Sequence, residues 1–161
     1  MLFRHELAYD ATPDEVFEML ADPTFRRRVS EALDVVSHDI TIERRGEGFS
    51  LVNDQVQRTA GLPALAKKFT GDTTRAVQRE EWADRSGGTL TIETPGKPSE
   101  ISGTISLSPS GSGTLEVVEL DITVRVPLIG HKLEALLDRQ IHDSIDGEHE
   151  VGKAWLTGEH A

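Results

Sequence analysis

The sequence predicts an α+β fold in which one antiparallel sheet is covered by a long C-terminal helix. Three observations predict it. Residues 128–155 carry an apolar stripe at helical spacing. Residues 35–126 contain six segments in which apolar and polar side chains alternate, and turn sequences such as 46–48 and 84–88 separate neighbouring segments. Because hairpin turns make adjacent strands antiparallel and a sheet with one apolar face needs a cover, the helix is expected to lie across the sheet.

The N-terminal region predicts one strand followed by two short helices. Residues 2–9 alternate as a strand does. Thr12, Pro13 and Glu15 then supply the N-cap, the first helical residue and the capping box of a short helix. Thr24 is expected to cap a second short helix, in which apolar residues recur at fourfold spacing.

Six more strands are expected before the long helix. They are residues 35–43, 49–60, 73–83, 89–94, 101–107 and 115–126. The second of these has polar residues on both faces, Asp54 and Arg58 on one and Asn53 and Gln55 on the other, so either face could line a wet space.

Composition favours one domain over residues 1–161, since a chain of 161 residues has an ordinary domain size. There is no cysteine, which excludes disulfides and thiolate metal sites. The start of the chain does not resemble a secretory signal and no segment is long and apolar enough to span a membrane, so a cytoplasmic protein without stable membrane insertion is expected. A net charge of -11 argues against a nucleic-acid partner. The one basic cluster, Arg26 to Arg28, is interpreted as a solvated face.

The element order resembles the START-like superfamily, also called SRPBCC, which includes the birch-pollen allergen type and the polyketide cyclases. The resemblance covers the whole chain. It depends on the helix from Pro13 to Leu20, the apolar insert at Leu62-Pro63, Trp82 at the end of a strand, and the entry Pro127 to Gly130 into the last helix. The sequence looks most like an uncharacterised actinobacterial subfamily. The resemblance implies a helix-grip fold, with a curved antiparallel sheet of about seven strands, two short N-terminal helices and a long C-terminal helix. It also implies a cavity between sheet and helix for an apolar ligand, but no shared catalytic motif.

On the long helix, Ile141, Ile145, Glu148 and Gly152 fall on the arc that faces the sheet. A carboxylate on that arc must find a partner, keep a proton or contact water in a cavity, unless the helix bends or ends early enough to expose it. Gly152 indicates either close packing on the sheet or room for a ligand. These four residues and Trp82 are candidate ligand contacts.

His5 and His38 are the two histidines that alternation places on apolar strand faces. The first interpretation of each is a core histidine with a satisfied hydrogen bond. The sharper hypothesis is that both contact the polar end of a ligand together with Glu148, with Asp54 and Arg58 as further candidates. No metal site is expected, because His131, His142 and His149 lie off the inward arc of the helix.

The function expected from these features is binding or carriage of a small hydrophobic molecule, such as a lipid, a sterol-like compound or a polyketide. An acid-base enzyme of cyclase, dehydratase or hydrolase type, using pocket His and Glu, is the alternative, and an interaction module with a filled interior is the third. No cofactor is implied. The segment 61–71, with Leu62, Leu65 and Phe69, is interpreted as a lid, a partner contact or part of the core. The sequence does not identify the ligand or the oligomeric state.

Overall fold

The computed structural model describes residues 1–59, 63–64, 67–68 and 71–158. Its elements are β1 (Leu2–Tyr9), α1 (Pro13–Leu20), α2 (Pro23–Ala32), β2 (Ser37–Arg45), β3 (Gly48–Arg58), β4 (Thr73–Asp84), β5 (Gly87–Glu93), β6 (Ser99–Ser110), β7 (Gly113–Val124) and α4 (Gly130–Leu156). Leu62, Leu65 and Phe69, which were interpreted as a lid, a partner contact or part of the core, lie outside the described residues.

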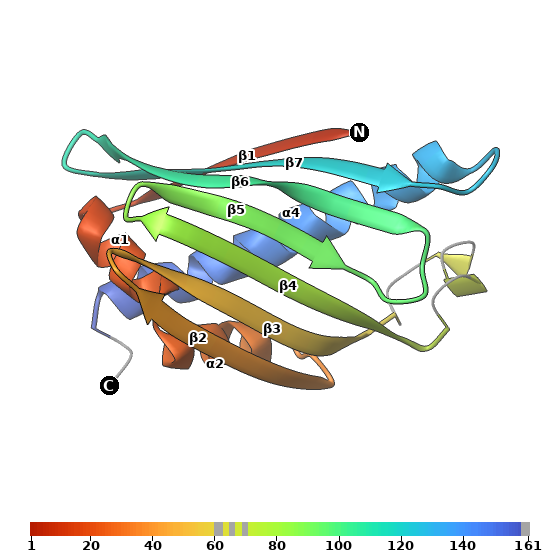
Figure 1. The fold of residues 1–161 in the computed structure, drawn as a ribbon, viewed down its shortest axis with the longest axis horizontal. Helices are drawn as coiled ribbons and strands as arrows, with labels where there is room; N and C mark the ends of the chain where they lie inside the picture. Colours follow the sequence, from red (N-terminus) through yellow and green to blue (C-terminus); the bar gives the residue numbers. More distant parts are fainter. Residues whose placement is uncertain (60–62, 65–66, 69–70, 159–161) are drawn as a thin grey trace.

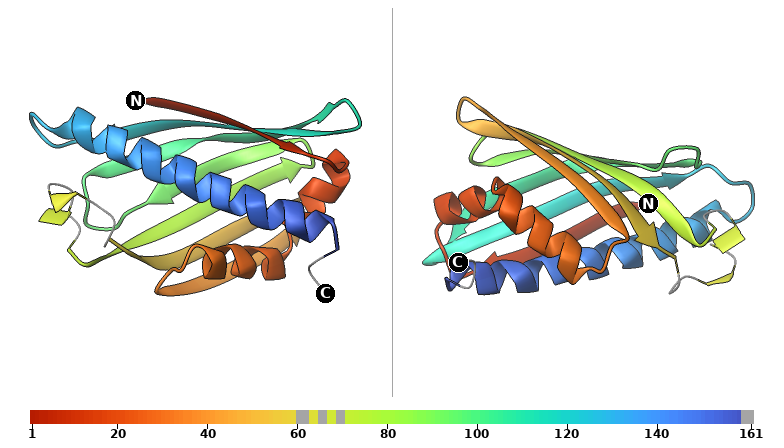
Figure 2. Two further views of the ribbon diagram at one scale, coloured as in Figure 1. Left: turned by 180° about the vertical axis from the view of Figure 1, so that it is seen from behind. Right: turned by 90° about the horizontal axis from the view of Figure 1, so that it is seen from below.

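The seven strands form one antiparallel sheet in the order β1-β7-β6-β5-β4-β3-β2. Each pair from β2 to β7 is a neighbour in sequence, whereas β1 pairs with β7, so that Phe3 lies opposite Leu120. The sheet is curved, α4 crosses one face of it diagonally, and α1 and α2 connect the two edge strands at one end (Figures 1 and 2). The predicted α+β helix-grip architecture is confirmed.

Local sequence accounts for both short helices. The Thr12 side chain accepts a hydrogen bond from the backbone N–H of Glu15, and the Glu15 carboxylate accepts one from the backbone N–H of Thr12, which completes the predicted capping box. At α2 the predicted cap was wrong by two residues. Asp22 is the N-cap and accepts from the backbone N–H of Thr24, because Pro23 occupies the first helical position.

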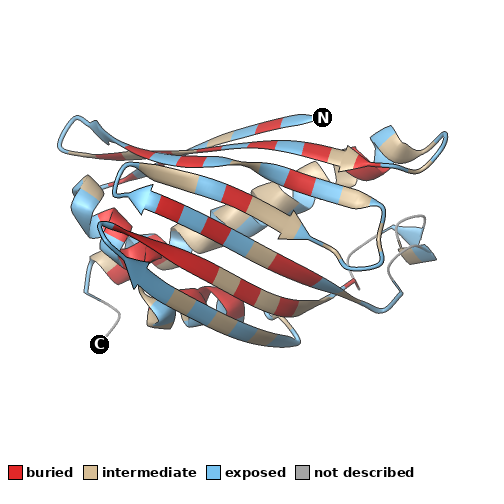
Figure 3. Cartoon of the chain, viewed as in Figure 1, coloured by how far each residue is buried: buried red, intermediate tan, exposed pale blue. Residues whose placement is uncertain are grey.

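Large aromatic side chains fill the interior at the α1 end of the sheet. The Trp82 ring stacks on Phe49 with centroids 5.3 Å apart, and the Phe17 ring contacts both edge-on. All three are almost fully buried. Figure 3 shows buried and exposed residues alternating along the strands, as expected for a sheet with one covered face.

Helix α4 supplies the cover, with Leu137, Ile141 and Ile145 packed against the core. Near its C-terminal end it lies close to β1, because a Cβ atom added to Gly152 would lie 2.9 Å from a Tyr9 ring carbon. Among the described residues, no helix is long and apolar enough to cross a membrane.

Candidate functional site: a cavity between the sheet and α4

A cavity of about 230 Å³ lies between the concave face of the sheet and α4. It begins where the aromatic core ends. Leu137, Ile141 and Ile145 of α4 form one wall, and Leu90 and Ile101 of the central strands contribute to the other. Most of its wall is therefore apolar, as in the small-molecule sites of proteins.

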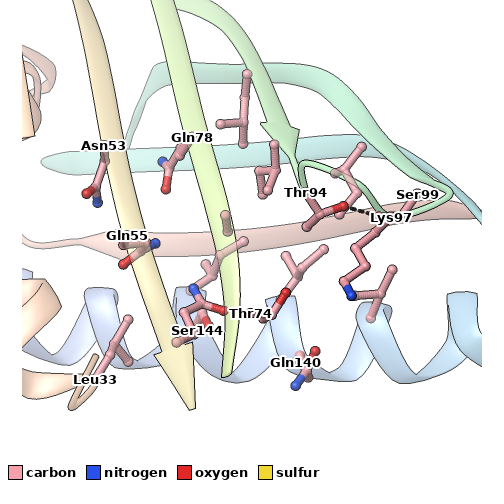
Figure 4. Close-up of a pocket in the computed structure, with 18 of the residues that line it drawn as sticks. Leu33, Asn53, Gln55, Thr74, Gln78, Thr94, Lys97, Ser99, Gln140 and Ser144 are labelled. Carbon is pink, nitrogen blue, oxygen red and sulfur yellow. Dashed lines mark hydrogen bonds between the residues drawn. The ribbon is translucent and has the colours of Figure 1, made fainter. Parts of the chain in front are cut away.

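The cavity opens to solvent beside α4. Leu33 at the end of α2 and Gln140 and Ser144 of α4 line the cavity although they are exposed, which marks an opening on this side of the helix. Figure 4 shows Gln140 and Ser144 on α4, Leu33 at the end of α2, and Asn53, Gln55 and Gln78 along the strands. A ligand could therefore enter without unfolding of the sheet.

An ion pair lies at one end of the cavity, beside the aromatic core. The Arg26 guanidinium donates two hydrogen bonds of 3.0 Å to the two Glu80 carboxylate oxygens and a third, of 2.7 Å, to the carbonyl of Leu20. Glu80 also accepts from Gln78 and from the Trp82 indole N–H, at 2.6 and 3.0 Å. Both charged side chains are at most 5% exposed. Such a bidentate, fully hydrogen-bonded pair has its charges compensated.

Two further carboxyl groups, Glu116 of β7 and Glu148 of α4, lie close enough to this pair to alter each other's titration. Burial raises the pKa of Glu116 to about 8, and the nearby Glu148 and Glu80 add to the shift while Arg26 opposes it. Burial also raises the pKa of Glu148, again against the influence of Arg26. Three carboxyl groups thus surround one guanidinium.

Several polar atoms around this cluster have no hydrogen-bond partner in the described part of the chain. Buried examples are the Tyr9 hydroxyl, Asn53 Oδ1 and Glu116 Oε1. The Glu148 carboxylate lines the cavity and likewise has neither a hydrogen bond nor an ion pair to any described residue. Unpaired buried polar atoms are rare and costly, so this end of the cavity is suited to polar groups of a bound molecule or to water.

Almost the whole chain matches one known protein family. Residues 4–156 match the family model described as "Protein of unknown function (DUF2505)". The chain belongs to the DUF2505 family. A similar sequence is the uncharacterized protein Rv0481c of Mycobacterium tuberculosis, which is 32% identical over 115 residues, covering 66% of this chain and 65% of Rv0481c. The match thus spans less than two thirds of that relative.

Solved structures share the helix-grip fold of this DUF2505 protein. TTHA0849 from Thermus thermophilus superposes with a TM-score of 0.67 at 21% identity, over 96% of this chain and 98% of that one. The di-domain ARO/CYC protein StfQ from the steffimycin biosynthetic pathway superposes with a TM-score of 0.65 at 16% identity, over 95% of this chain and 49% of StfQ. The resemblance inferred from the sequence is confirmed.

Three of the nine candidate contacts line the cavity of this DUF2505 protein. These are Ile141, Ile145 and Glu148, which α4 presents on successive turns. The helix does not bend Glu148 away to solvent, since the residue is only partly exposed. Their binding of a ligand stays a proposal.

The expectation that His5 and His38 open on the same cavity is not met. His5 faces α4, but its Nε2 lies 2.6 Å from Asp146 Oδ1 and its ring packs 4.6 Å from that of His142, at the edge formed by β1. His38 is on β2, the opposite edge strand. Neither lines the cavity, because a central cavity in a seven-stranded sheet is out of reach of residues at its edges.

The other four candidates also lie outside the cavity lining. Asp54 pairs with Arg75 on the outer face, with an oxygen–nitrogen distance of 2.6 Å, and Arg58 lies 3.7 Å from Asp34. Trp82 belongs to the aromatic core. Gly152 permits close packing, the first of its two interpretations, since an added Cβ atom would meet Tyr9.

The polar end depends on residues that were not among the nine candidate contacts, although their strand positions carried a signal. Each polar residue lies two positions from a buried apolar one and therefore on the same face of its strand: Glu80 with Trp82, Glu116 with Val118, and Asn53 with Leu51. The interpretation of Arg26 to Arg28 as a solvated face was wrong for Arg26. This side chain is buried between α2 and the sheet, where it pairs with Glu80. Among the described residues, no group of three His, Asp or Glu side chains is arranged to hold a metal ion.

Proposed function

We propose that the protein binds a small, mostly apolar molecule in the cavity between the sheet and α4, and that residues 1–161 form one domain for this purpose. The observation that carries the proposal is the cavity itself, with apolar walls, an opening beside α4 and a polar end. A protein interior is normally packed to crystal density, so an unfilled space of this size has a use.

The cavity volume limits the size of the ligand. An apolar cavity of about 150 Å³ holds benzene, so a cavity of about 230 Å³ suits a molecule roughly half as large again. A substituted single ring or a short acyl chain fits this space, whereas a sterol would have to extend through the opening. Of the ligand classes expected from the sequence, the smaller ones are favoured.

Apolar contact alone gives weak binding in a space of this size. Burial of roughly 200 Å² of apolar ligand surface contributes about 5 kcal/mol, and association consumes most of that. Affinity and specificity therefore depend on the polar end, where Glu148, Asn53 and Arg26 line the cavity.

Native mass spectrometry on protein purified from its own host tests the proposal. The expected result is a retained small molecule that is lost when the cavity is filled by Ala76→Phe, since Ala76 lines the cavity and is buried. Ala83→Phe is the matched control, because Ala83 is exposed on the same strand. Equal occupancy in the two variants, or empty wild-type protein that also fails to bind added propylbenzene, would refute the proposal.

A second candidate function is acid-base catalysis by Glu148. The specific observation in its favour is a carboxyl group with a raised pKa and no described partner, facing a ligand cavity. His5 and His38 take no part in this version, because neither lines the cavity. A change in the mass of the retained molecule during incubation, absent in Glu148→Gln, would favour the enzyme, and an unchanged mass would favour the carrier.

A further inference from the structure

The balance of charge at the polar end of the cavity is uneven. Glu80, Glu116 and Glu148 surround a single cation, Arg26, and Arg26 already pairs with Glu80 through two hydrogen bonds. Glu116 and Glu148 thus have no cation of their own among the described residues. In a site of low dielectric, each must hold a proton or receive a positive charge from elsewhere.

Hydrogen-bond acceptors without a donor also lie at this end of the cavity. Asn53 is 7% exposed, lines the cavity, and leaves its Oδ1 acceptor without a partner among the described residues. It lies opposite Gln78 in the β3–β4 ladder, and Gln78 donates to Glu80, so Asn53 belongs to the same end of the cavity as the ion pair. The oxygens of Glu148 are further acceptors. A molecule that fits here brings donors.

We propose that the ligand carries a protonated amine, and that Glu148 and Asn53 Oδ1 accept hydrogen bonds from its ammonium group while the apolar part lies along Ile141 and Ile145. This inference rests on the proposed function and names its ligand class. An ammonium group is a donor only and carries the charge that the carboxyl cluster lacks. The ammonium group favours the carboxylate form of Glu148, so any proton that Glu148 holds in the free protein is released to solvent on binding, and charge is then conserved at the site.

The other charged and titratable groups around the site agree with this assignment. Tyr9 of β1 is neutral, because burial and the nearby Glu116 and Glu148 raise the pKa of its hydroxyl. Lys97 also lines the cavity, in the turn between β5 and β6, and Figure 4 shows it on the opposite side of the cavity from Asn53. The overall charge of -11 attracts cations to the opening.

The test compares probes that share one shape and size. We choose 2-phenylethylamine, 2-phenylethanol and propylbenzene, which have the same number of non-hydrogen atoms, with phenylacetate as an anionic probe, and measure binding by calorimetry. The amine is expected to bind about tenfold or more tightly than the alcohol, as a charge-assisted hydrogen bond implies. The preference is expected to disappear in Glu148→Gln and to shrink in Asn53→Leu.

Two controls distinguish the site from general attraction. Glu150→Gln removes an exposed carboxylate from the same helix, one that pairs with Lys153, and is expected to leave the preference unchanged. Affinity for the amine is also expected to rise with pH, because burial raises the pKa of Glu148 and the carboxyl group loses its proton as the pH rises, while an alkylammonium group stays charged. Affinity for propylbenzene is expected to stay constant.

Each outcome decides between the two proposals. Binding of the alcohol, propylbenzene or phenylacetate as tight as that of the amine overturns the amine assignment and leaves the cavity proposal standing. An amine preference that survives in Glu148→Gln overturns it as well. No binding of any probe, in protein whose circular dichroism shows the native fold, refutes the cavity proposal itself.

Discussion

The buried carboxyl group of Glu116 makes the stability of the fold depend on pH. Its pKa is about 8 in the folded protein and 4.5 in an exposed chain. The folded state therefore binds this proton more tightly than the unfolded state does. The contribution of Glu116 to the free energy of unfolding should therefore be greatest below about pH 4.5. It should fall as the pH rises toward about 8.

The magnitude follows from the shift. Each pKa unit corresponds to about 1.4 kcal/mol, so a shift from 4.5 to about 8 corresponds to about 5 kcal/mol as a ceiling. Water penetration and local relaxation make the real contribution smaller than this ceiling. The free energy of unfolding is expected to fall by at least about 2 kcal/mol between about pH 5 and about pH 9. Glu116→Gln places a neutral group of the same shape there and should remove this part of the pH dependence.

Urea denaturation followed by circular dichroism, repeated across this pH range, measures the effect. Glu119→Gln is the control, because Glu119 lies on the opposite face of β7 and its side chain is 61% exposed. We expect the stability of Glu119→Gln to fall with pH as that of the wild type does. If Glu116→Gln shows the same fall, Glu116 does not hold a proton in the folded protein and the account of the polar end is wrong.

Two further predictions concern packing and charge. Arg26→Leu should destabilise the fold by about 3–5 kcal/mol, because it leaves the buried Glu80 carboxylate without its partner, and the double variant Arg26→Leu/Glu80→Leu should recover part of that loss in thermal unfolding. Full additivity of the two single variants would contradict this. Gly152→Ala should cost about 1–3 kcal/mol, because its Cβ atom would lie 2.9 Å from the Tyr9 ring, whereas Gly147→Ala meets only the flexible end of an exposed leucine and should be neutral or stabilising by up to about 1 kcal/mol. Equal melting temperatures for the two glycine variants would show that α4 does not pack on β1 as described.

The sequence was sufficient for the architecture because its periodic signals are local. The alternation along the six strands and the stripe on residues 128–155 depend only on which face is buried, and both predictions are confirmed, the stripe by α4 over Gly130–Leu156. The capping box of α1 was found for the same reason. The cap of α2 was placed two residues late, at Thr24, because Thr24 and Asp22 are both residue types that cap helices and only Asp22 directly precedes the proline at the first helical position.

The site was only partly predictable, because polar residues inside a fold depend on partners far away in sequence. Glu148 was found from its position on the helix alone. Arg26 was not, since nothing near it shows that Glu80, 54 residues later, will pair with it. On β3 the alternation left two faces open, and the candidates came from the face with Asp54, whereas the cavity is lined by the face with Asn53.

The histidines show the limit of the alternation rule. Alternation identifies the face of a strand but not the position of that strand in the sheet. His5 and His38 are on edge strands, because β1 closes one side of the sheet and β2 the other. That order follows from the long-range pairing of β1 with β7, which no local pattern encodes.

The central claim is that an open space beneath α4 takes an apolar ligand, and methyl NMR on isoleucine-labelled protein tests it most directly. On addition of propylbenzene, the methyl signals of Ile141 and Ile145, which line the cavity, should shift with saturation. The signal of Ile122, which is fully buried but does not line the cavity, should stay in place. Unchanged signals for Ile141 and Ile145, or equal shifts for all three residues, would contradict the account.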